Sequence, residues 1–478
     1  MRNRFSNRGS FGRRSAALLA MLTLPTAIAC DADQILEVED IDVASPESVS
    51  DPAALPAVLA GAIGDFGVAY NGGGDFNQVT LAGQLSDELY NTETFPTRIE
   101  NDQRKQQYQS NGSLQGLFYA THQGRASADR AAEGYISLDK ATDIGLAEAL
   151  NISALSYIIL AENYCNAVPI STAHADGSFT YGPALTTEQL LNVAVAKADS
   201  ALANATATGG VGTAAKRTEQ ARLARVVKAR ALLNLNKPAE AAAAIGGETG
   251  VPTTFQYNYL HSETTGRQNN GTWGVTVSVA RFGVPDREGT NGLPFLSEGN
   301  TAGTVKDPRI ANVLRGGTGR GFDNATTQYM QQKYPLRPSA VTIADGVEAR
   351  LIEAEAALRA GNAASALAIL NALRSNAALL TLRGYAASSL APLPLAGTPA
   401  AQIDQLFKER AYWLYLTSHR LGDLRRLVRQ YSRGAETVFP TGAYHKSGTY
   451  GTDVNSPIPQ AEDNNPNFQR SGCVATQA

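Results

Sequence analysis

The chain has 478 residues, of which 18% are charged, with a formal net charge of −3 and three cysteines. This length is enough for two or three domains' worth of core. The acidic balance excludes a global basic surface for nucleic acid, so no nucleic-acid partner is predicted.

The first 29 residues are typical of a secretory signal peptide. Five arginines and no acidic residue occupy the first fourteen positions, and residues 16–28 are almost entirely apolar. The apolar run is too short to span a bilayer as a mature helix, which needs about 20 residues. Cleavage after residue 29 would leave 36 basic against 44 acidic residues, a net charge of −8.

The tetrapeptide Ala27-Ile28-Ala29-Cys30 resembles the lipobox of bacterial lipoproteins. In that class a diacylglycerol is attached to the cysteine thiol, and the cysteine becomes the new N-terminus. Each buried CH₂ of an acyl chain contributes about 0.8 kcal/mol to membrane binding. We therefore predict a membrane anchor at Cys30; the alternative is an ordinary cleaved signal. No later segment has 18 continuous apolar residues, so no second crossing is predicted.

Residues 30–52 are predicted to be an acidic tether that does not fold by itself. Six of the twelve residues from Asp31 to Asp42 are acidic, and such a segment buries too little apolar surface to fold. The two other cysteines, Cys165 and Cys473, lie 308 residues apart. In an exported protein such a pair can form a disulfide or remain as two separate thiols, and the sequence leaves both open.

The body, residues 53–478, is mainly α-helical by its apolar periodicity. The predicted helices cover 52–70, 112–134, 143–164, 187–205, 214–235, 346–360, 363–377 and 400–430. Residues 229–245 align without gaps to 354–370, with six identities, and each copy contains a helix, a two-residue turn and a second helix. Small residues at the crossing points indicate tetratricopeptide-like hairpins. Pro238 marks the start of a second helix. The helical scaffold therefore covers about 53–249 and 341–478.

Residues 250–340 form a predicted insert that is rich in loops, partly β, and faces the ligand. This region is rich in Gly, Asn, Thr and aromatic residues, and residues 272–282 favour one or two strands. Loop-rich segments on a helical scaffold often carry binding function. Aromatic faces stack on sugar rings or apolar peptide side chains. Candidate ligand contacts are Trp273, Tyr257 and Tyr259, with Phe95 from a second loop region; the alternative is a satellite core under the loops.

The run at 408–427 predicts a structural ion-pair network. Glu409, Trp413, Leu416 and Arg420 follow three- and four-residue steps along the predicted helix 400–430, and Arg420, Asp423 and Arg426 continue at three-residue spacing. Acids and bases therefore share one face, and we predict that Glu409, Arg420, Asp423 and Arg426 form ion pairs between helices; the alternative is a catalytic role.

Signals for catalysis or for a cofactor are weak. The five histidines have no metal-ligand spacing, the glycine-rich segment 316–321 lacks the lysine of a phosphate loop, and no G-x-S-x-G element occurs. We predict no enzyme activity, no metal and no cofactor. One alternative is a secreted hydrolase that uses carboxylates of the insert, such as Glu263, Asp286 and Glu288.

Short motifs near the C-terminus are joined by earlier landmarks along the chain. They are Glu409-Arg410, His419-Arg420, Asp423-Leu424, Arg426, Pro457-Ile458-Pro459, Glu462 and Asn465-Pro466-Asn467, and earlier Leu85-Ser86-Asp87-Glu88, Asn163-Tyr164, Val168-Pro169, Asp307-Pro308-Arg309 and Arg350-Leu351-Ile352-Glu353-Ala354-Glu355-Ala356. In this combination the chain resembles the SusD/RagB family of outer-membrane nutrient-binding lipoproteins. These motifs occur in order along nearly the whole mature chain.

The resemblance implies a mostly helical protein with tetratricopeptide-like units and a loop-rich ligand face. It implies a lipid-anchored protein of the outer membrane, expected at the cell surface, with no catalytic machinery of its own. Its expected partners are an oligosaccharide or a peptide and a TonB-dependent outer-membrane barrel. The alternative is a tetratricopeptide-like scaffold that binds partner proteins without a small-molecule ligand.

Overall fold

The computed structural model describes residues 51–478 except 75, 174–177, 302–303 and 386–388. The predicted signal peptide, Cys30 and nearly all of the acidic tether lie outside the described residues. The described residues all belong to the unit Val49–Ala478.

Helices account for most of the described regular structure. The α-helices are α3 (Leu55–Asn71), α4 (Gln78–Leu85), α5 (Pro96–Asp102), α6 (Gly112–Ser137), α7 (Ile144–Asn163), α8 (Thr187–Thr206), α9 (Ala214–Asn234), α10 (Pro238–Ile245), α11 (Gly247–Gly250), α12 (Gly271–Trp273), α13 (Phe295–Gly299), α14 (Gly346–Arg359), α15 (Ala363–Ser375), α16 (Ala377–Leu382), α17 (Pro399–Trp413) and α18 (Arg420–Tyr431). The mainly α fold predicted from the sequence is confirmed.

The strands are short and pair in twos, all antiparallel. The pairs are β1 (Tyr90–Asn91) with β7 (Phe282–Gly283), β2 (Val168–Pro169) with β5 (Ala184–Leu185), β3 (Thr172–Ala173) with β4 (Phe179–Thr180), β6 (Gln256–Tyr259) with β12 (Val341–Asp345), β8 (Asn300–Thr301) with β9 (Thr304–Val305), and β10 (Asn312–Leu314) with β11 (Tyr329–Gln331). Two of these pairs, β1 with β7 and β6 with β12, join segments far apart in the chain, so these strands connect distant loops.

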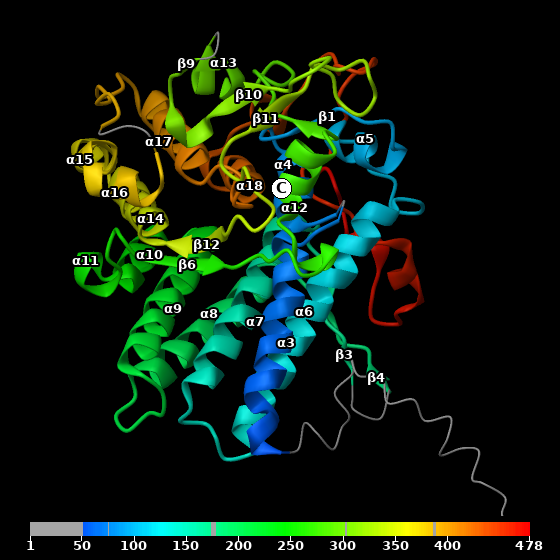
Figure 1. Cartoon of the computed structure of the whole chain (residues 1–478). Helices are drawn as coiled ribbons and strands as arrows, with labels where there is room; N and C mark the ends of the chain where they lie inside the picture. The colour runs from blue at the N-terminus through cyan, green and yellow to red at the C-terminus, as the bar shows by residue number, and fades with distance from the viewer. Residues whose placement is uncertain (1–50, 75, 174–177, 302–303, 386–388) are drawn as a thin grey trace, which may run out of the picture. The chain divides into compact units, whose positions relative to one another are not determined.

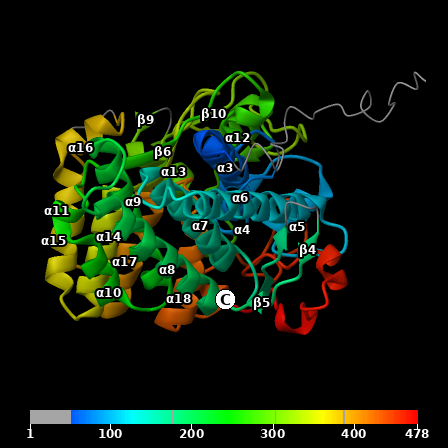
Figure 2. The same ribbon diagram turned by 90° about the horizontal axis from the view of Figure 1, so that it is seen from below.

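The long helices pack as successive antiparallel neighbours. Helix α3 packs on α6, α6 on α7, α7 on α8, and α8 on α9, and Figure 1 shows them side by side. The two predicted copies are the pairs α9–α10 and α14–α15, and α10 also packs on α14. Figure 2 shows α10, α14 and α15 as neighbours from a second direction. The internal repeat therefore corresponds to two helical hairpins in contact.

Local signals set the ends of these hairpins. Helix α10 begins at Pro238, as predicted, because a missing N–H at the first turn removes no hydrogen bond. Between α14 and α15 the chain turns at Gly361, whose φ of +80° favours glycine, and the Asn362 side chain accepts a bond from Ser365 N.

Helix α7 is the centre of the core. All of its residues except Leu150 are buried, against α6, α8 and α9. By length and apolar composition, α7 and the stretch Pro52–Asn71 are each sufficient to cross a membrane. The apolar window of α7 is fully buried inside the protein, as for the core helix of a soluble domain, and 39% of the window in Pro52–Asn71 is buried.

The predicted strand at 272–282 is mostly wrong. Residues 271–273 are helical, and Gly274–Ser278 forms a π-helical turn; only Phe282 and Gly283 are extended. The Asn270 side chain caps this helix by accepting from Trp273 N at 2.8 Å. The β-branched residues Thr272, Val275 and Thr276 favoured a strand in the sequence, but they are buried in a helical turn, and burial rather than strand propensity accounts for them.

The predicted continuous helix 400–430 is also wrong, because the chain unwinds between α17 and α18. Leu416 and Ser418 have φ of +51° and +65°. Distant side chains bond the freed backbone: Glu88 Oε1 accepts from Leu416 N at 2.9 Å, and Tyr334 donates to Leu416 O at 2.9 Å. Tyr70 donates to Thr417 O at 2.8 Å. The break therefore depends on tertiary contacts.

The four residues of the predicted ion-pair network are buried, and each pairs with a charged side chain of another helix or segment, in more than one group. Arg420 does not pair within its own helix; its guanidinium makes two hydrogen bonds to the carboxylate of Asp87, at 2.6 and 2.8 Å. Asp423 accepts from Arg426 at 2.8 Å and from Arg410 at 2.8 and 2.9 Å. These pairs fasten α18 to α17 and to the segment after α4.

Glu409 belongs to a separate cluster. It accepts from Arg309, at 2.7 and 3.2 Å, and from Arg374 at 2.6 Å. Arg426 also pairs with Glu355 of α14. The sequence could not separate these groups because the unwound segment changes which face each side chain occupies.

The buried carboxyl of Glu88 is expected to make the stability of the protein depend on pH. Burial raises the pKa of Glu88 to about 8, and Asp87 adds to the rise. The folded-state pKa lies above the unfolded value of 4.5, so the protonated carboxyl stabilises the folded protein. Its contribution to the free energy of unfolding is fully present below about pH 4.5 and is lost as pH rises through about 8. We expect Glu88→Gln, measured by denaturant unfolding, to gain stability relative to the wild type between pH 5 and 8. Parallel pH profiles for the two proteins would contradict this.

The buried ion pairs of Asp423 with Arg410 and Arg426 are expected to stabilise the fold. Burial alone would raise the pKa of Asp423, but Arg410 and Arg426 outweigh it and hold that pKa well below its usual range. Asp423→Ala leaves two buried guanidiniums without this partner, which costs about 3–5 kcal/mol of unfolding free energy.

The matched control for Asp423→Ala is Asp404→Ala on α17. Asp404 pairs with Arg433 at 2.7 Å, but its side chain is 64% exposed. We expect a loss under about 1 kcal/mol there. Equal losses for the two variants in denaturant titrations would refute the role given to the buried pairs.

Candidate functional site

Two exposed phenylalanines and two arginines form a small platform. Phe95 is 44% exposed and Phe322 45% exposed. The Arg281 guanidinium carbon lies 5.0 Å from the centre of the Phe95 ring and 4.7 Å from that of Phe322. Arg98 lies 4.5 Å from the centre of the Phe95 ring. We call Phe95, Arg98, Arg281 and Phe322 the Phe95 platform.

A buried carboxylate holds the cations of the Phe95 platform in place. Glu93, with a side chain that is 0% exposed, accepts from Arg98 Nη2 at 2.8 Å and lies 3.4 Å from Arg281 Nη1. One buried carboxylate therefore pairs with both guanidinium groups, while both rings stay partly open to solvent. An aromatic ring beside a guanidinium can stack on a ligand and lies next to hydrogen-bond donors.

Three separate loops converge to build the Phe95 platform. Strand β1 pairs with β7, and Thr92 N donates to Arg281 O at 2.8 Å. Phe322 N donates to Ala280 O at 2.8 Å, and Asp323 N donates to Thr92 O at 3.0 Å. A Cβ at Gly321 would lie 2.4 Å from Thr92, so glycine permits this close approach. Backbone hydrogen bonds thus fix the relative positions of the rings.

The predicted ligand contacts do not all lie on the Phe95 platform. Tyr257 is buried, and its hydroxyl donates to Glu148 at 3.2 Å, so it is a core residue. Tyr259 packs its half-buried ring against Gly67 of α3. Trp273 is partly buried against the main core, with the Arg337 guanidinium 5.3 Å from its ring centre. Of the four predicted contacts, Phe95 belongs to the platform.

Sequence reasoning did not select Arg281 or Phe322 as ligand contacts. Both lie in the insert, but their distance in sequence from Phe95 gives no signal of contact. The cation between the two rings is a product of the β1–β7 pairing.

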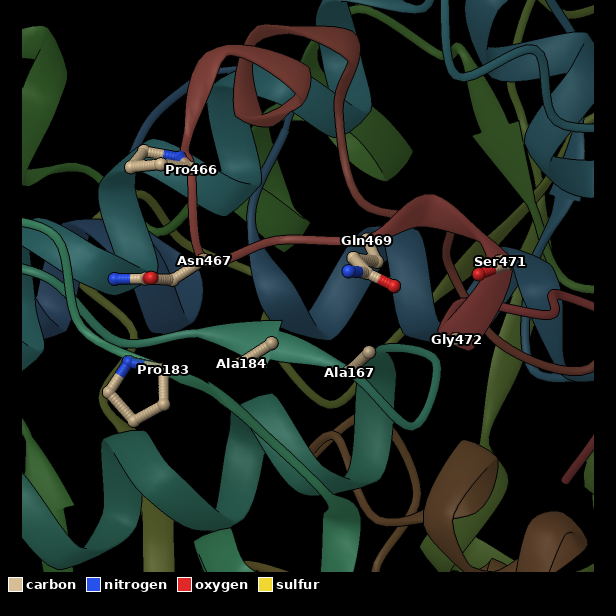
Figure 3. A pocket seen from close by; sticks show the side chains of 8 residues that line it. All are labelled: Ala167, Pro183, Ala184, Pro466, Asn467, Gln469, Ser471 and Gly472. Atoms are coloured by element: carbon tan, nitrogen blue, oxygen red, sulfur yellow. The ribbon is translucent and has the colours of Figure 1, made fainter.

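The structure also contains a shallow pocket of about 570 Å³ beside the C-terminal loop (Figure 3). Its polar side chains are Asn467, Gln469 and Ser471, and no aromatic residue lines it. Cys165 and Cys473 form a disulfide next to it, with Cα atoms 4.9 Å apart, which joins the end of α7 to the C-terminal segment. Because the pocket has no aromatic residue and the Phe95 platform has two exposed rings beside guanidinium groups, we take the platform as the candidate site.

Comparisons with known proteins identify the architecture. No family model and no curated protein matches the sequence. Among solved structures, a SusD superfamily protein from Bacteroides vulgatus superimposes with a TM-score of 0.60 at 15% identity, covering 88% of this chain and 99% of the other. The chain has the SusD-like fold.

Further solved structures with the SusD-like fold match equally well. A SusD/RagB family protein from Bacteroides thetaiotaomicron has a TM-score of 0.61 at 15% identity, with 86% of this chain and 94% of the other covered. The surface glycan-binding protein A from Bacteroides uniformis has a TM-score of 0.60 at 15% identity, with 88% and 100% covered. The SusD-like fold therefore extends over nearly all of the described chain.

Proposed function

We propose that this chain is a lipid-anchored protein of the outer cell surface that binds an oligosaccharide and passes it to a TonB-dependent outer-membrane barrel. The observation that carries the proposal is the SusD-like fold together with the exposed rings of the Phe95 platform. One protein of this fold is named for surface glycan binding. The lipobox at Cys30 supports the anchor, and the signal peptide supports export.

The chemistry of the Phe95 platform suits a sugar. Phe95 and Phe322 offer apolar faces for the C–H faces of a pyranose ring, and Arg281 lies between them as a donor for hydroxyl oxygens. Because Glu93 and the backbone bonds hold these groups before a ligand arrives, little conformational entropy is lost on binding.

Removing one ring tests the Phe95 platform. We expect Phe95→Ala to weaken glycan affinity about tenfold, a loss of about 1–2 kcal/mol, because truncation of a central aromatic contact removes stacking area. Affinity electrophoresis in gels that contain a panel of soluble polysaccharides measures the effect. The matched control is Phe179→Ala on β4, which removes a ring that is 65% exposed outside the platform. If Phe95→Ala and the wild type migrate alike in every gel that retards the wild type, the platform is not the site.

Partner capture tests the transport role. Affinity purification of the full chain through a C-terminal tag, from gently solubilised native membranes, is expected to recover a TonB-dependent barrel as the main partner. The control is the Cys30→Ser chain, which lacks the acylated thiol and should lose both membrane retention and the barrel. Recovery of soluble proteins without a barrel would favour the alternative of a tetratricopeptide-like scaffold.

A further inference from the structure

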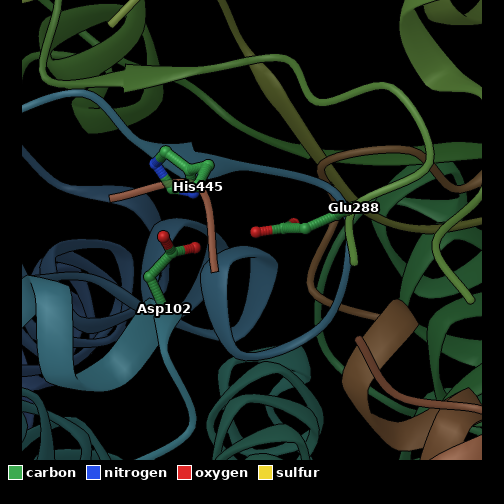
Figure 4. Close-up of side chains that lie close together, drawn as sticks. All are labelled: Asp102, Glu288 and His445. Carbon is green, nitrogen blue, oxygen red and sulfur yellow. The ribbon is translucent and has the colours of Figure 1, made fainter. Parts of the chain in front are cut away.

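Three ligand-type side chains from distant segments meet near β1. Asp102 ends α5, Glu288 follows β7, and His445 lies in the C-terminal loop. One ligand atom from each lies within 4.8 Å of the others, and Figure 4 shows the three side chains converging. Asp102 is 1% exposed and Glu288 6% exposed, whereas His445 lies at the surface.

The contacts of the two carboxyls leave one oxygen of each without a donor. Asp102 Oδ2 accepts from Asn91 N at 3.0 Å and from the Tyr444 hydroxyl at 2.6 Å. Glu288 Oε1 accepts from the Tyr450 hydroxyl at 2.9 Å. Asp102 Oδ1 and Glu288 Oε2 are buried and find no hydrogen-bond donor among the described residues. Two buried acceptors in one cluster require a proton or a cation.

His445 is held in a tautomer that suits metal binding. Its Nε2 lies 2.7 Å from the Asn91 carbonyl oxygen, so the neutral ring donates from Nε2 and keeps the lone pair on Nδ1. A backbone carbonyl that accepts from one ring nitrogen is the usual arrangement behind a metal-binding histidine. The ring also packs edge-on against Tyr90 and Tyr444, at 5.0 and 4.4 Å between centres.

The charge balance of the cluster favours a cation. Asp102 and Glu288 are both buried, so their carboxylates carry a desolvation cost that a positive charge beside them would offset. The nearby Arg104 is committed elsewhere, to Glu436 at 2.9 Å and to the Asp453 carbonyl at 2.8 Å. A dication would neutralise both carboxylates at once, whereas one shared proton would neutralise only one of them.

We propose that Asp102, Glu288 and His445 bind a divalent transition-metal ion of the zinc class. Imidazole with carboxylate oxygens is a ligand set for such ions, whereas calcium takes six to eight oxygens. Three protein ligands leave a fourth position for water. The ion would tie α5, the segment after β7 and the C-terminal loop to one point. The proposal stands apart from glycan binding, since none of the three ligands belongs to the Phe95 platform.

The test is metal titration of the full chain, purified in detergent through a tag without histidine and stripped with chelator. We expect one equivalent of Co²⁺ to give saturable visible absorption, one equivalent of Zn²⁺ to displace it, and Ca²⁺ to leave it unchanged. Zn²⁺ is also expected to raise the melting temperature in a concentration-dependent way, because it binds the folded state.

Two variants and one control decide the assignment. Glu288→Gln and His445→Gln should each weaken Co²⁺ and Zn²⁺ binding at least tenfold; His445 is at the surface, so its replacement leaves the fold intact. Glu263→Gln, an exposed carboxylate outside the cluster, should bind as the wild type does. No saturable one-equivalent binding by the wild type would show that the carboxyls share a proton instead. Unchanged binding in both ligand variants would show that any metal taken up sits elsewhere, and either result overturns the proposal.

Discussion

The architecture depends on arginines buried against carboxylates between helices. Asp87, Glu348, Glu355 and Glu409 each accept from an arginine of a distant segment, and the side chains of these pairs are nearly all shielded from water. A buried charge without its partner costs several kcal/mol, so each pair permits one way for two helical surfaces to meet. Apolar packing alone would allow these alanine-rich helices to slide, because small side chains offer few distinct shapes.

The same constraint explains the unwound segment between α17 and α18. If residues 400–430 formed one straight helix, Arg420 and Glu409 would keep a fixed angular relation along a single face. Because of the break, Arg420 on α18 can pair with Asp87, while Glu409 on α17 pairs with Arg309. The irregular backbone is stable because Glu88, Tyr334 and Tyr70 bond its polar groups.

The loops of the Phe95 platform are held in place by backbone hydrogen bonds to one another. The Phe95 platform consists of loop residues, yet its rings are fixed by backbone bonds between Thr92, Ala280 and Asp323 and their neighbours. The Asp102–Glu288–His445 cluster lies on the other side of the same strand, since Asn91 bonds both Asp102 and His445. One short strand pair, β1 with β7, thus links the Phe95 platform to the Asp102–Glu288–His445 cluster.

The helices at 112–134, 143–164, 187–205 and 214–235 were predictable, with ends near the observed ones, because apolar spacing along a helix is a local property. The paired hairpins followed from the same kind of signal, as did the start of α10 at Pro238. The disulfide partners, the helical turn at Trp273 and the burial of Tyr257 were not decided locally. Each depends on residues far away in the chain, such as Glu148 for the Tyr257 hydroxyl.

The sequence by itself therefore determined the helical scaffold, its internal repeat and the SusD-like fold. Only the tertiary structure decided which side chains of distant segments meet. It placed Arg281 between Phe95 and Phe322, and it joined Asp102, Glu288 and His445 from three segments without any motif spacing. The physical reason is that a helix is specified by neighbours three and four residues apart, whereas a site is specified by contacts that form only after the loops have been fastened together.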